Sequence, residues 1–285
     1  MPDNNTNNGG KLVLVATPIG NLGDVSERQI AAFREADLIA AEDTRHSGLL
    51  LHHLGIKKPM ISYYRHNEAK REDQLLDELA AGRNIALISD AGTPGICDPG
   101  AAILRTAAAQ DFEVDAIPGP CALIQALVLS GLSTERFAFE GFVPRGSELT
   151  PYLQGLKSEP RTLVFYEAPH RLHHTLSAMR DAFGADRPAA VCRELTKKFQ
   201  EIGRGTLGEL CREWQQRDPR GEFVLVIAGA DAAAAATPDD DAIRAHLARL
   251  LDGGMKLKAA SREIAAAYGI PAKAAYEMGL TLKQE

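Results

Sequence analysis

The sequence has no long hydrophobic run, and this absence excludes an integral membrane protein. No apolar stretch approaches the roughly 20 residues that a membrane-spanning helix requires. Residues 1–10 are polar and rich in asparagine, unlike the charged and then apolar start of a signal peptide. We therefore expect a soluble, cytoplasmic protein with no membrane partner, whose residues 1–10 form a disordered tail.

Cysteine is also scarce. The four cysteines are widely spaced and form no CxxC pair, so the sequence indicates neither a zinc knuckle nor a disulfide framework. Three histidines at helical spacing have no carboxylate or cysteine at ligand spacing, and we expect no metal site there. The cysteines are Cys97, Cys121, Cys192 and Cys211, and the histidines are His170, His173 and His174.

Positive charge is not in excess either. The formal net charge is −6, from 32 Lys and Arg against 38 Asp and Glu. Such a chain has no overall attraction to nucleic acid, so any RNA binding must come from local patches of Lys and Arg.

What the sequence does have, over residues 84–100, is a predicted strand followed directly by a glycine-rich loop. Ile85, Ala86, Leu87 and Ile88 form an apolar run that is typical of a strand buried on both faces. Five glycines and prolines then prevent regular structure. In a parallel α/β sheet such a loop lies at the carboxyl edge, where ligands bind, and we place the ligand there.

The chemistry of this loop argues against a phosphate ligand. It carries Asp90 and Asp98 and no lysine, whereas a phosphate cradle normally recruits a Lys or Arg and avoids carboxylates. A neutral or cationic ligand with hydroxyl and amine donors suits it better. The alternative is a tight turn with two solvated aspartates.

Alternating strand and helix patterns predict an α/β fold with two α/β domains and a cleft between them. In the first, residues 11–118, strands are expected over 12–17, 38–41, 59–64, 85–89 and 114–117. Helices are expected from a capping box at Ser26 and Gln29 and over 49–54, 68–81 and 101–109. In the second, residues 119–230, helices are expected over 121–129, 172–183 and 207–216, and strands over 137–143, 162–166, 189–194, 199–203 and 223–228.

A low-complexity linker, residues 231–241, leads to a third part. It ends in a strong helix start, with Thr237 as N-cap and acids in the first turn. We expect three helices, ending at Gly253, over 257–268 and over 272–282, so that residues 242–285 form a small helix-turn-helix-like module. This module holds Lys256 and Lys258 in a basic stretch, which suits RNA or an ordinary solvated surface equally well on charge alone.

Several ordered motifs together resemble one family, the ribosomal RNA small subunit methyltransferase I family, a branch of the tetrapyrrole methylase superfamily. The match runs in order, with gaps, over about residues 11–285, which is far more specific than a single glycine loop. The motifs are TPIGNL at 17–22, AEDTRH at 41–46, SDAGTPG at 89–95, DPG at 98–100, PGPCA at 118–122, FYEAPHRL at 165–172, RELTK at 193–197 and GEFVLVI at 221–227.

The resemblance implies an S-adenosylmethionine-dependent enzyme that binds its cofactor between two α/β domains, usually as a homodimer. In that family the reaction is 2′-O-methylation of a cytidine ribose in the decoding region of 16S rRNA, within the small ribosomal subunit. By motif, the implied cofactor-binding residues are Pro18, Ser89, Asp90, Ala91, Gly92, Thr93, Pro120, Ala122, Tyr166 and Phe223.

A ribose hydroxyl is a poor nucleophile, so a nearby base or cation should assist it. The expected catalytic residues are Asp43, Arg45, His46 and Glu167, with His170 and Lys197 as further candidates for the base. Asp43 and Arg45 also suit a surface ion pair. The expected RNA-binding residues, chosen for their ability to hold phosphate, are Arg45, Arg171, Lys197, Lys256 and Lys258.

Two other functions stay open. One is a methyltransferase that acts on a tetrapyrrole or another small molecule, and the other is a non-catalytic RNA- or nucleotide-binding protein. Two departures from the family are also visible: after Pro144 this chain reads Arg-Gly-Ser-Glu-Leu where many members carry several Lys and Arg, and residues 230–241 match no family motif.

Overall fold

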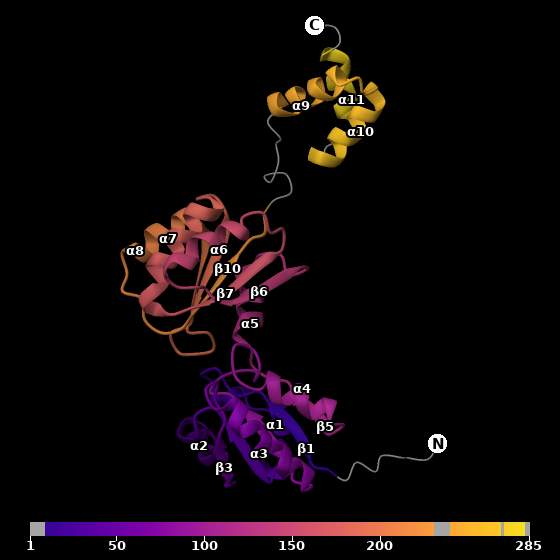
Figure 1. Ribbon diagram of the computed structural model, residues 1–285. Helices are drawn as coiled ribbons and strands as arrows, with labels where there is room; N and C mark the ends of the chain where they lie inside the picture. The colour runs from indigo at the N-terminus through magenta and orange to yellow at the C-terminus, as the bar shows by residue number, and fades with distance from the viewer. Residues whose placement is uncertain (1–8, 231–239, 269–270, 283–285) are drawn as a thin grey trace. The chain divides into compact units, whose positions relative to one another are not determined.

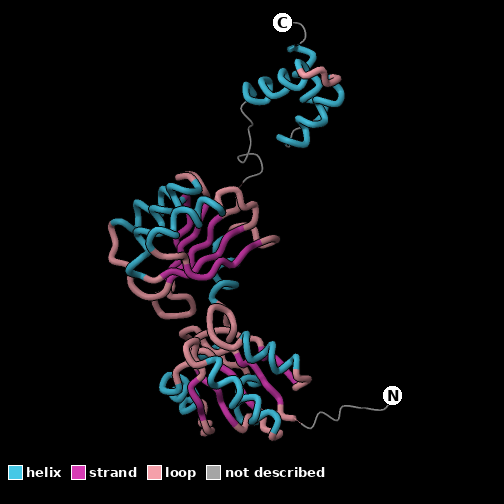
Figure 2. Tube along the Cα trace, viewed as in Figure 1, coloured by secondary structure: helices cyan, strands magenta, loops and turns pink. Residues whose placement is uncertain are grey.

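The computed structural model describes residues 9–230, 240–268 and 271–282, whose helices and strands are drawn in Figures 1 and 2. Most of the predicted tail and linker, with the Thr237 helix start, lies outside the described residues. Contacts divide the chain into two compact units. One extends to Gln154 and continues over Thr162–Ala228, and the other combines Gly155–Arg161 with the chain from Gly229 onward. The first unit holds both sheets, so the boundary at residue 118 stays a prediction.

The first sheet is parallel throughout, as the alternating pattern predicts. Its strand order is β3-β2-β4-β1-β5, which places β4 at its centre. The strands are β1 (Lys11–Val15), β2 (Leu38–Ala41), β3 (Met60–Ser62), β4 (Ile85–Ile88) and β5 (Glu113–Ile117). The helices are α1 (Glu27–Glu35), α2 (Thr44–His53), α3 (Glu68–Ala80) and α4 (Ala101–Ala109).

Both faces of this sheet are buried. Leu12, Ile85 and Leu87 contribute to one hydrophobic cluster with residues of α3 and α4, and Ile39 and Ile88 contribute to another with α1 and α2. All four residues of β4 are buried, which explains why its sequence is continuously apolar rather than alternating. Sandwiched between two helical layers, β4 fixes the loop that follows it.

The helix after β1 begins as predicted. Ser26 and Gln29 form a reciprocal capping box at the start of α1. The amide of Gln29 also donates to the carbonyl oxygen of Ala16 at 2.7 Å, which ties the helix start to the end of β1. The loop between them is thereby held at both ends.

One helix boundary was predicted wrongly. Helix α2 begins at Thr44, five residues before the predicted start at residue 49. Asp43 acts as its N-cap, because its carboxylate accepts the backbone N–H of Arg45 at 2.8 Å. The charged segment after β2 is therefore the first turn of a helix.

The second sheet is mixed. Its order is β6-β7-β10-β8-β9, and only β6 and β7 are parallel. Helix α5 packs against it through Leu123 and Leu127. The strands are β6 (Phe137–Phe142), β7 (Thr162–Glu167), β8 (Pro188–Arg193), β9 (Glu201–Thr206) and β10 (Phe223–Ile227). The helices are α5 (Ala122–Ser130), α6 (Leu149–Gly155), which the sequence did not predict, α7 (Leu172–Phe183) and α8 (Leu207–Gln215). Short 3-10 turns span Leu22–Asp24, Gly146–Glu148 and Pro169–Arg171.

The C-terminal module has three helices: α9 (Asp240–Asp252), α10 (Leu257–Tyr268) and α11 (Ala272–Leu282), and the bounds of the last two are those predicted. Its core is formed by five side chains: Ile243, Leu247, Ala260, Ile264 and Ala275. Among the described residues, no helix has the length and apolar character that crossing a membrane requires.

Candidate functional site

The loop after β4 is hydrogen-bonded to the loop after β1. The backbone of Gly92 exchanges two hydrogen bonds with that of Thr17: the Thr17 N–H donates at 2.8 Å and the Gly92 N–H at 3.0 Å. Gly92 has φ of +83°, and a Cβ there would lie 3.3 Å from Cγ2 of Ile19. Both facts require glycine, because a side chain would be strained and crowded.

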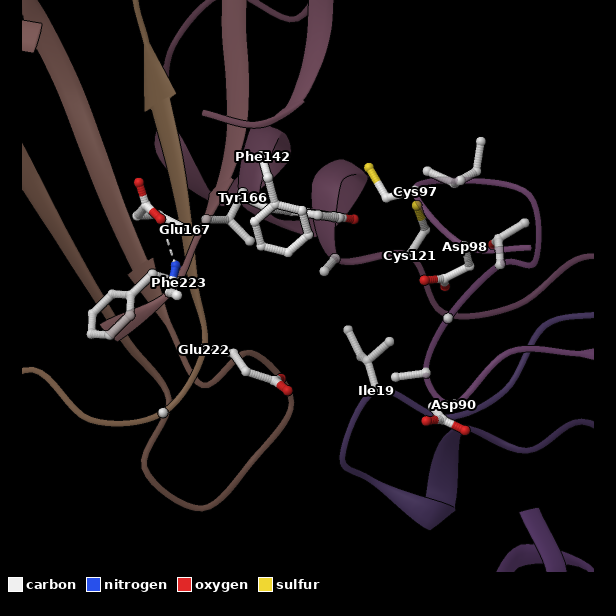
Figure 3. Close-up of a pocket in the computed structure, with 18 of the residues that line it drawn as sticks. Ile19, Asp90, Cys97, Asp98, Cys121, Phe142, Tyr166, Glu167, Glu222 and Phe223 are labelled. Carbon is white, nitrogen blue, oxygen red and sulfur yellow. Dashed lines mark hydrogen bonds between the residues drawn. The ribbon is translucent and has the colours of Figure 1, made fainter. Parts of the chain in front are cut away.

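A pocket of about 430 Å³ lies beside this loop (Figure 3). The first-sheet loops supply one wall, where Figure 3 labels Ile19, Asp90 and Asp98, and the ends of β6, β7 and β10 supply the other. The lining residues are Ile19, Glu42, Asp90, Ala91, Gly92, Thr93, Ile96, Cys97, Asp98, Cys121, Ala122, Phe142, Tyr166, Glu167, Ala168, Pro169, Gly221, Glu222, Phe223 and Val224.

Carboxylates dominate the polar lining. Glu42, Asp90 and Asp98 lie on the first-sheet side, and two more acids, Glu167 and Glu222, lie on the other. No Lys, Arg or His is among the described residues that line this pocket. Glu167 and Glu222 have cationic partners outside the lining, and the three acids on the first-sheet side make that wall one that attracts a cation and repels a polyphosphate.

Hydrogen bonds hold two of these acids in place. Asp90 Oδ1 accepts the backbone N–H of Asp43 at 3.0 Å. Glu42 in turn accepts the N–H of Asp90 at 3.4 Å. These contacts join the end of β2 to the glycine-rich loop, so the acids come from two neighbouring strands of one sheet edge.

Crowding of acids changes their protonation. Burial, and then the charge of Glu42, raises the pKa of Asp98 to about 6, although a hydrogen bond from Ser89 opposes the shift. Burial also raises the pKa of Glu42. Because a nearby cation would relieve this repulsion, the free pocket is electrostatically prepared for a positively charged ligand.

The opposite wall is aromatic. The ring of Tyr166 packs edge-on against Phe139 and Phe142, with centroids 4.9 and 5.6 Å apart. Burial raises the pKa of the Tyr166 hydroxyl, so it remains protonated and able to donate. Phe223 is buried against Trp214 with centroids 5.1 Å apart. The pocket thus combines a polar acidic side with an apolar side that suits a ring.

Glu167 lines the pocket but is fully engaged within the protein. Its carboxylate accepts the hydroxyl of Thr175 at 2.5 Å and the N–H of Ala168 at 2.8 Å. Arg171 pairs with it at 3.4 Å and also donates to the carbonyl oxygen of Pro144 at 2.7 Å. The Arg171 side chain is only 13% exposed. These contacts give both residues a structural task, and the predicted catalytic and RNA-binding roles stay predictions.

A second pocket, of about 230 Å³, adjoins the first and shares Asp90 with it. It contains three further residues of the predicted site: Pro18, His46 and Ser89. Pro120 lines neither pocket, although its carbonyl oxygen accepts a hydrogen bond of 3.5 Å from Thr93. The second pocket's lining residues are Thr17, Pro18, Gly20, Leu22, His46, Ser47, Leu49, Leu50, Ser89 and Asp90.

Asp43 and Arg45 line neither pocket. They form the surface ion pair that the sequence allowed, at 2.8 Å, and the Arg45 side chain is 90% exposed. Hydrogen bonds from the Arg45 side chain and backbone lower the pKa of Asp43 to about 2. Asp43 is therefore a weak base, whereas Arg45 is accessible to a ligand outside the protein.

The remaining predicted cations lie in two places. Lys197 Nζ is 2.9 Å from both Glu194 and Glu222, so it borders the first pocket through Glu222. Lys256 and Lys258 are exposed side chains of the C-terminal module.

Several lining residues have no role predicted from the sequence. Glu42 is part of a quoted motif, and its position directly after a buried strand is the same signal that marked Asp90. Glu222 and Phe142 stand at a strand start and a strand end, which could have been noticed. Nothing in the sequence places Cys97 beside Cys121, because tertiary packing alone brings them to the pocket. Among the described residues, no cluster of three or more His, Cys, Asp or Glu could hold a metal ion.

The pocket fits S-adenosylmethionine, the group that the family resemblance implies. A sulfonium and an ammonium are cations that suit the carboxylates, ribose hydroxyls can donate to them, and the aromatic wall suits an adenine ring. The five acids and the lack of bases are the observation behind this fit.

The two-sheet body and its acidic pocket define a methylase of the tetrapyrrole type: residues 11–211 match the family model of tetrapyrrole (corrin/porphyrin) methylases. A solved structure of diphthine synthase resembles the fold, with a TM-score of 0.61 and 16% identity over 77% of this chain and 89% of that one. Within this class, a relative of that name, 45% identical over 97% of this chain, shows that the chain belongs to the ribosomal RNA small subunit methyltransferase I family.

The relatives support this assignment over nearly the whole chain. The ribosomal RNA small subunit methyltransferase I of Synechocystis sp. is 45% identical over 97% of this chain and 99% of its own length. The protein of the same name from Thermotoga maritima is 43% identical over 77% of this chain and 99% of its own. The Thermotoga relative is thus shorter and has no counterpart to nearly a quarter of this chain.

Proposed function

We propose that this protein transfers a methyl group from S-adenosylmethionine to the ribose 2′-oxygen of a cytidine in the decoding region of 16S rRNA. Family membership supports the methyl transfer to small-subunit rRNA. The observation that carries the cofactor assignment is the pocket with five acids and no base. The choice of ribose and cytidine rests on the family resemblance.

The chain's own residues would hold the cofactor from two sides. The backbone of residues 90–93 would approach the cofactor closely because Gly92 has no side chain. Ala122 at the start of α5 carries only a methyl group. Tyr166 and Phe142 supply the apolar wall. S-adenosylmethionine supplies an electrophilic methyl on sulfur, and the sulfur keeps the bonding electron pair when the methyl leaves.

The acceptor must lose a proton as its oxygen takes the methyl group. Among the candidate bases, Asp43 is held ionised with a pKa of about 2 and is a poor proton acceptor. Asp98 lines the cofactor pocket, where a bound cation favours its ionised form. His46, which lines the adjoining pocket, is the candidate that remains on the acceptor side.

RNA contacts must come from local cations because the chain is acidic overall. Arg45 is exposed beside the second pocket's residue His46, and its planar guanidinium suits a phosphate. Lys256 and Lys258 offer further phosphate contacts from the C-terminal module. These contacts are electrostatic, so binding to the small subunit should weaken steeply with salt.

A homodimer that works in the cytoplasm completes the proposal. It follows from the resemblance, and α5 offers an apolar surface that a second copy would cover: Ile124 and Val128, one turn apart, are 45% and 65% exposed. Light scattering of the purified protein at micromolar concentration should give twice the chain mass of 30.7 kDa.

The test offers labelled S-adenosylmethionine and three acceptors: unmodified 30S subunits, free 16S rRNA and a tetrapyrrole. We expect label in RNA with 30S subunits or free rRNA and none in the tetrapyrrole. Label in the tetrapyrrole alone would support the small-molecule alternative. Binding of RNA without transfer to any acceptor would support a non-catalytic role, and either result would overturn the proposal.

A further inference from the structure

Beside Pro18 and Ser89, for which the resemblance implies cofactor contacts, the second pocket is lined by residues with no such role, among them Leu22, Ser47 and Leu49. It lies between the loop after β1, which supplies Pro18 and Leu22, and helix α2, which supplies Ser47 and Leu49. Asp90 lines both pockets. A group bound here therefore shares one wall residue with whatever the first pocket holds.

One buried polar atom in this pocket lacks a partner. Ser47 is 2% exposed, and its hydroxyl makes no hydrogen bond within the described part of the chain. Two other buried helical serines are satisfied: the hydroxyls of Ser130 and Ser261 donate to carbonyl oxygens of Leu127 and Leu257, both at 2.7 Å. An unsatisfied buried hydroxyl costs stability and calls for a partner that the chain itself does not provide.

The rim of the pocket is apolar and exposed. Leu49 is 71% exposed and Leu22 is 47% exposed, and they come from the two elements that border the pocket. Exposed leucines around a polar floor suit a flat ring that enters edge first, with its polar edge toward the floor. A base taken out of its stack presents such a ring and leaves an apolar gap for a side chain to fill.

The size and charge of the pocket further restrict the kind of ligand that it can bind. At about 230 Å³ it is smaller than the pockets of drug-sized ligands, of roughly 300–1,000 Å³, and suits one base rather than a macrocycle. Carboxylates accept hydrogen bonds from the amino group of cytosine. Asp90 therefore favours a base with an amino group over one with a carbonyl at the same position.

We propose that this second pocket receives the base of the acceptor nucleotide, unstacked from the RNA, with Ser47 and Asp90 contacting its polar edge. Leu22 and Leu49 pack into the gap that the unstacked base leaves between its neighbours in the RNA. The inference rests on the proposed function and names the substrate subsite. Ser47 and Leu49 are specificity-determining residues in this account and touch the base, whereas the methyl donor occupies the first pocket.

The experiment measures methyl transfer to unmodified 30S subunits by three variants: Ser47→Ala, Leu49→Ala and the control Ser130→Ala. We expect Ser47→Ala to raise the KM for 30S subunits about fivefold, the equivalent of one hydrogen bond. Leu49→Ala should raise it roughly three- to tenfold through lost apolar contact. The Kd for S-adenosylmethionine should stay within about twofold of wild type, because neither residue lines the first pocket.

The control separates a binding role from a structural one. Removing the unpartnered Ser47 hydroxyl should leave Tm unchanged or raise it, whereas Ser130→Ala removes a satisfied hydrogen bond and should lower Tm without changing KM. An unchanged KM in both pocket variants would overturn the inference. Wild-type protein that does not methylate 30S subunits would instead refute the proposed function.

Discussion

Asp98 should make the affinity for S-adenosylmethionine depend on pH. Its carboxyl lines the pocket among Glu42 and Asp90, with Arg65 as the nearby positive charge, and has a pKa of about 6. A cationic ligand favours the ionised form, so binding below that pKa must first release a proton. Affinity should therefore rise as pH increases through 6 and level off above 7.

The pKa of Asp98 determines how much the Kd for S-adenosylmethionine changes with pH. With a pKa of about 6, the carboxyl is only about one-tenth ionised at pH 5 and almost fully ionised at pH 7.5. If the ligand requires the ionised form, the Kd at pH 5 should be about tenfold higher than at pH 7.5. S-adenosylhomocysteine, which lacks the sulfonium charge, should show a smaller change.

Isothermal titration calorimetry of wild type and Asp98→Asn, from pH 5 to 7.5, measures both ligands. The variant should bind S-adenosylmethionine more weakly at pH 7.5 and lose most of the pH dependence. Because the folded pKa lies above the unfolded value of about 4, the ionised carboxyl destabilises the folded state above pH 6, so Asp98→Asn should raise Tm at pH 7.5. A flat wild-type profile, or the same slope in Asp98→Asn, would refute the reasoning.

Three other substitutions test separate parts of the structure. Arg171→Ala should lower the free energy of unfolding in urea by about 3 kcal/mol, because it leaves the buried Glu167 carboxylate without its charge partner, whereas Arg45→Ala should leave it unchanged. Gly92→Ala should cost about 1–3 kcal/mol through its positive φ and the contact with Ile19, and weaken cofactor binding; Gly184→Ala, also at positive φ but in open space, should leave cofactor binding unaffected. Arg45→Ala should lower turnover on 30S subunits about tenfold at nearly unchanged cofactor affinity. Arg45→Lys should not restore turnover, because a lysine cannot form the guanidinium's paired hydrogen bonds. Full activity of Arg45→Ala would show that this arginine has no part in the reaction.

The centre of the first sheet was predictable because its signals are local. An apolar run of four residues predicts a strand buried on both faces, and glycines and prolines predict the loop after it, so β4 and the loop that borders the pocket follow from adjacent residues. The same holds for α4, α7, α10 and α11, whose bounds agree with the predicted ones.

The remaining differences are one local signal, the helix N-cap at Asp43, and contacts that only the packed structure creates. Arg171 was chosen for RNA phosphate on its chemistry alone, and no local pattern shows that it lies 13% exposed against Glu167 and Pro144. The early start of α2 was missed because Asp43 was interpreted as a substrate-facing or ion-paired acid rather than as a helix N-cap. The unpartnered hydroxyl of Ser47 also exists only in the packed structure.

The most direct measurement maps the methyl group. Purified protein is incubated with labelled S-adenosylmethionine and unmodified 30S subunits, and the labelled nucleotide is isolated and its modified atom determined by mass spectrometry. We expect one labelled cytidine in the decoding region of 16S rRNA, with the methyl on its 2′-oxygen. Label on a base atom, or on a nucleotide elsewhere in the RNA, would contradict this expectation.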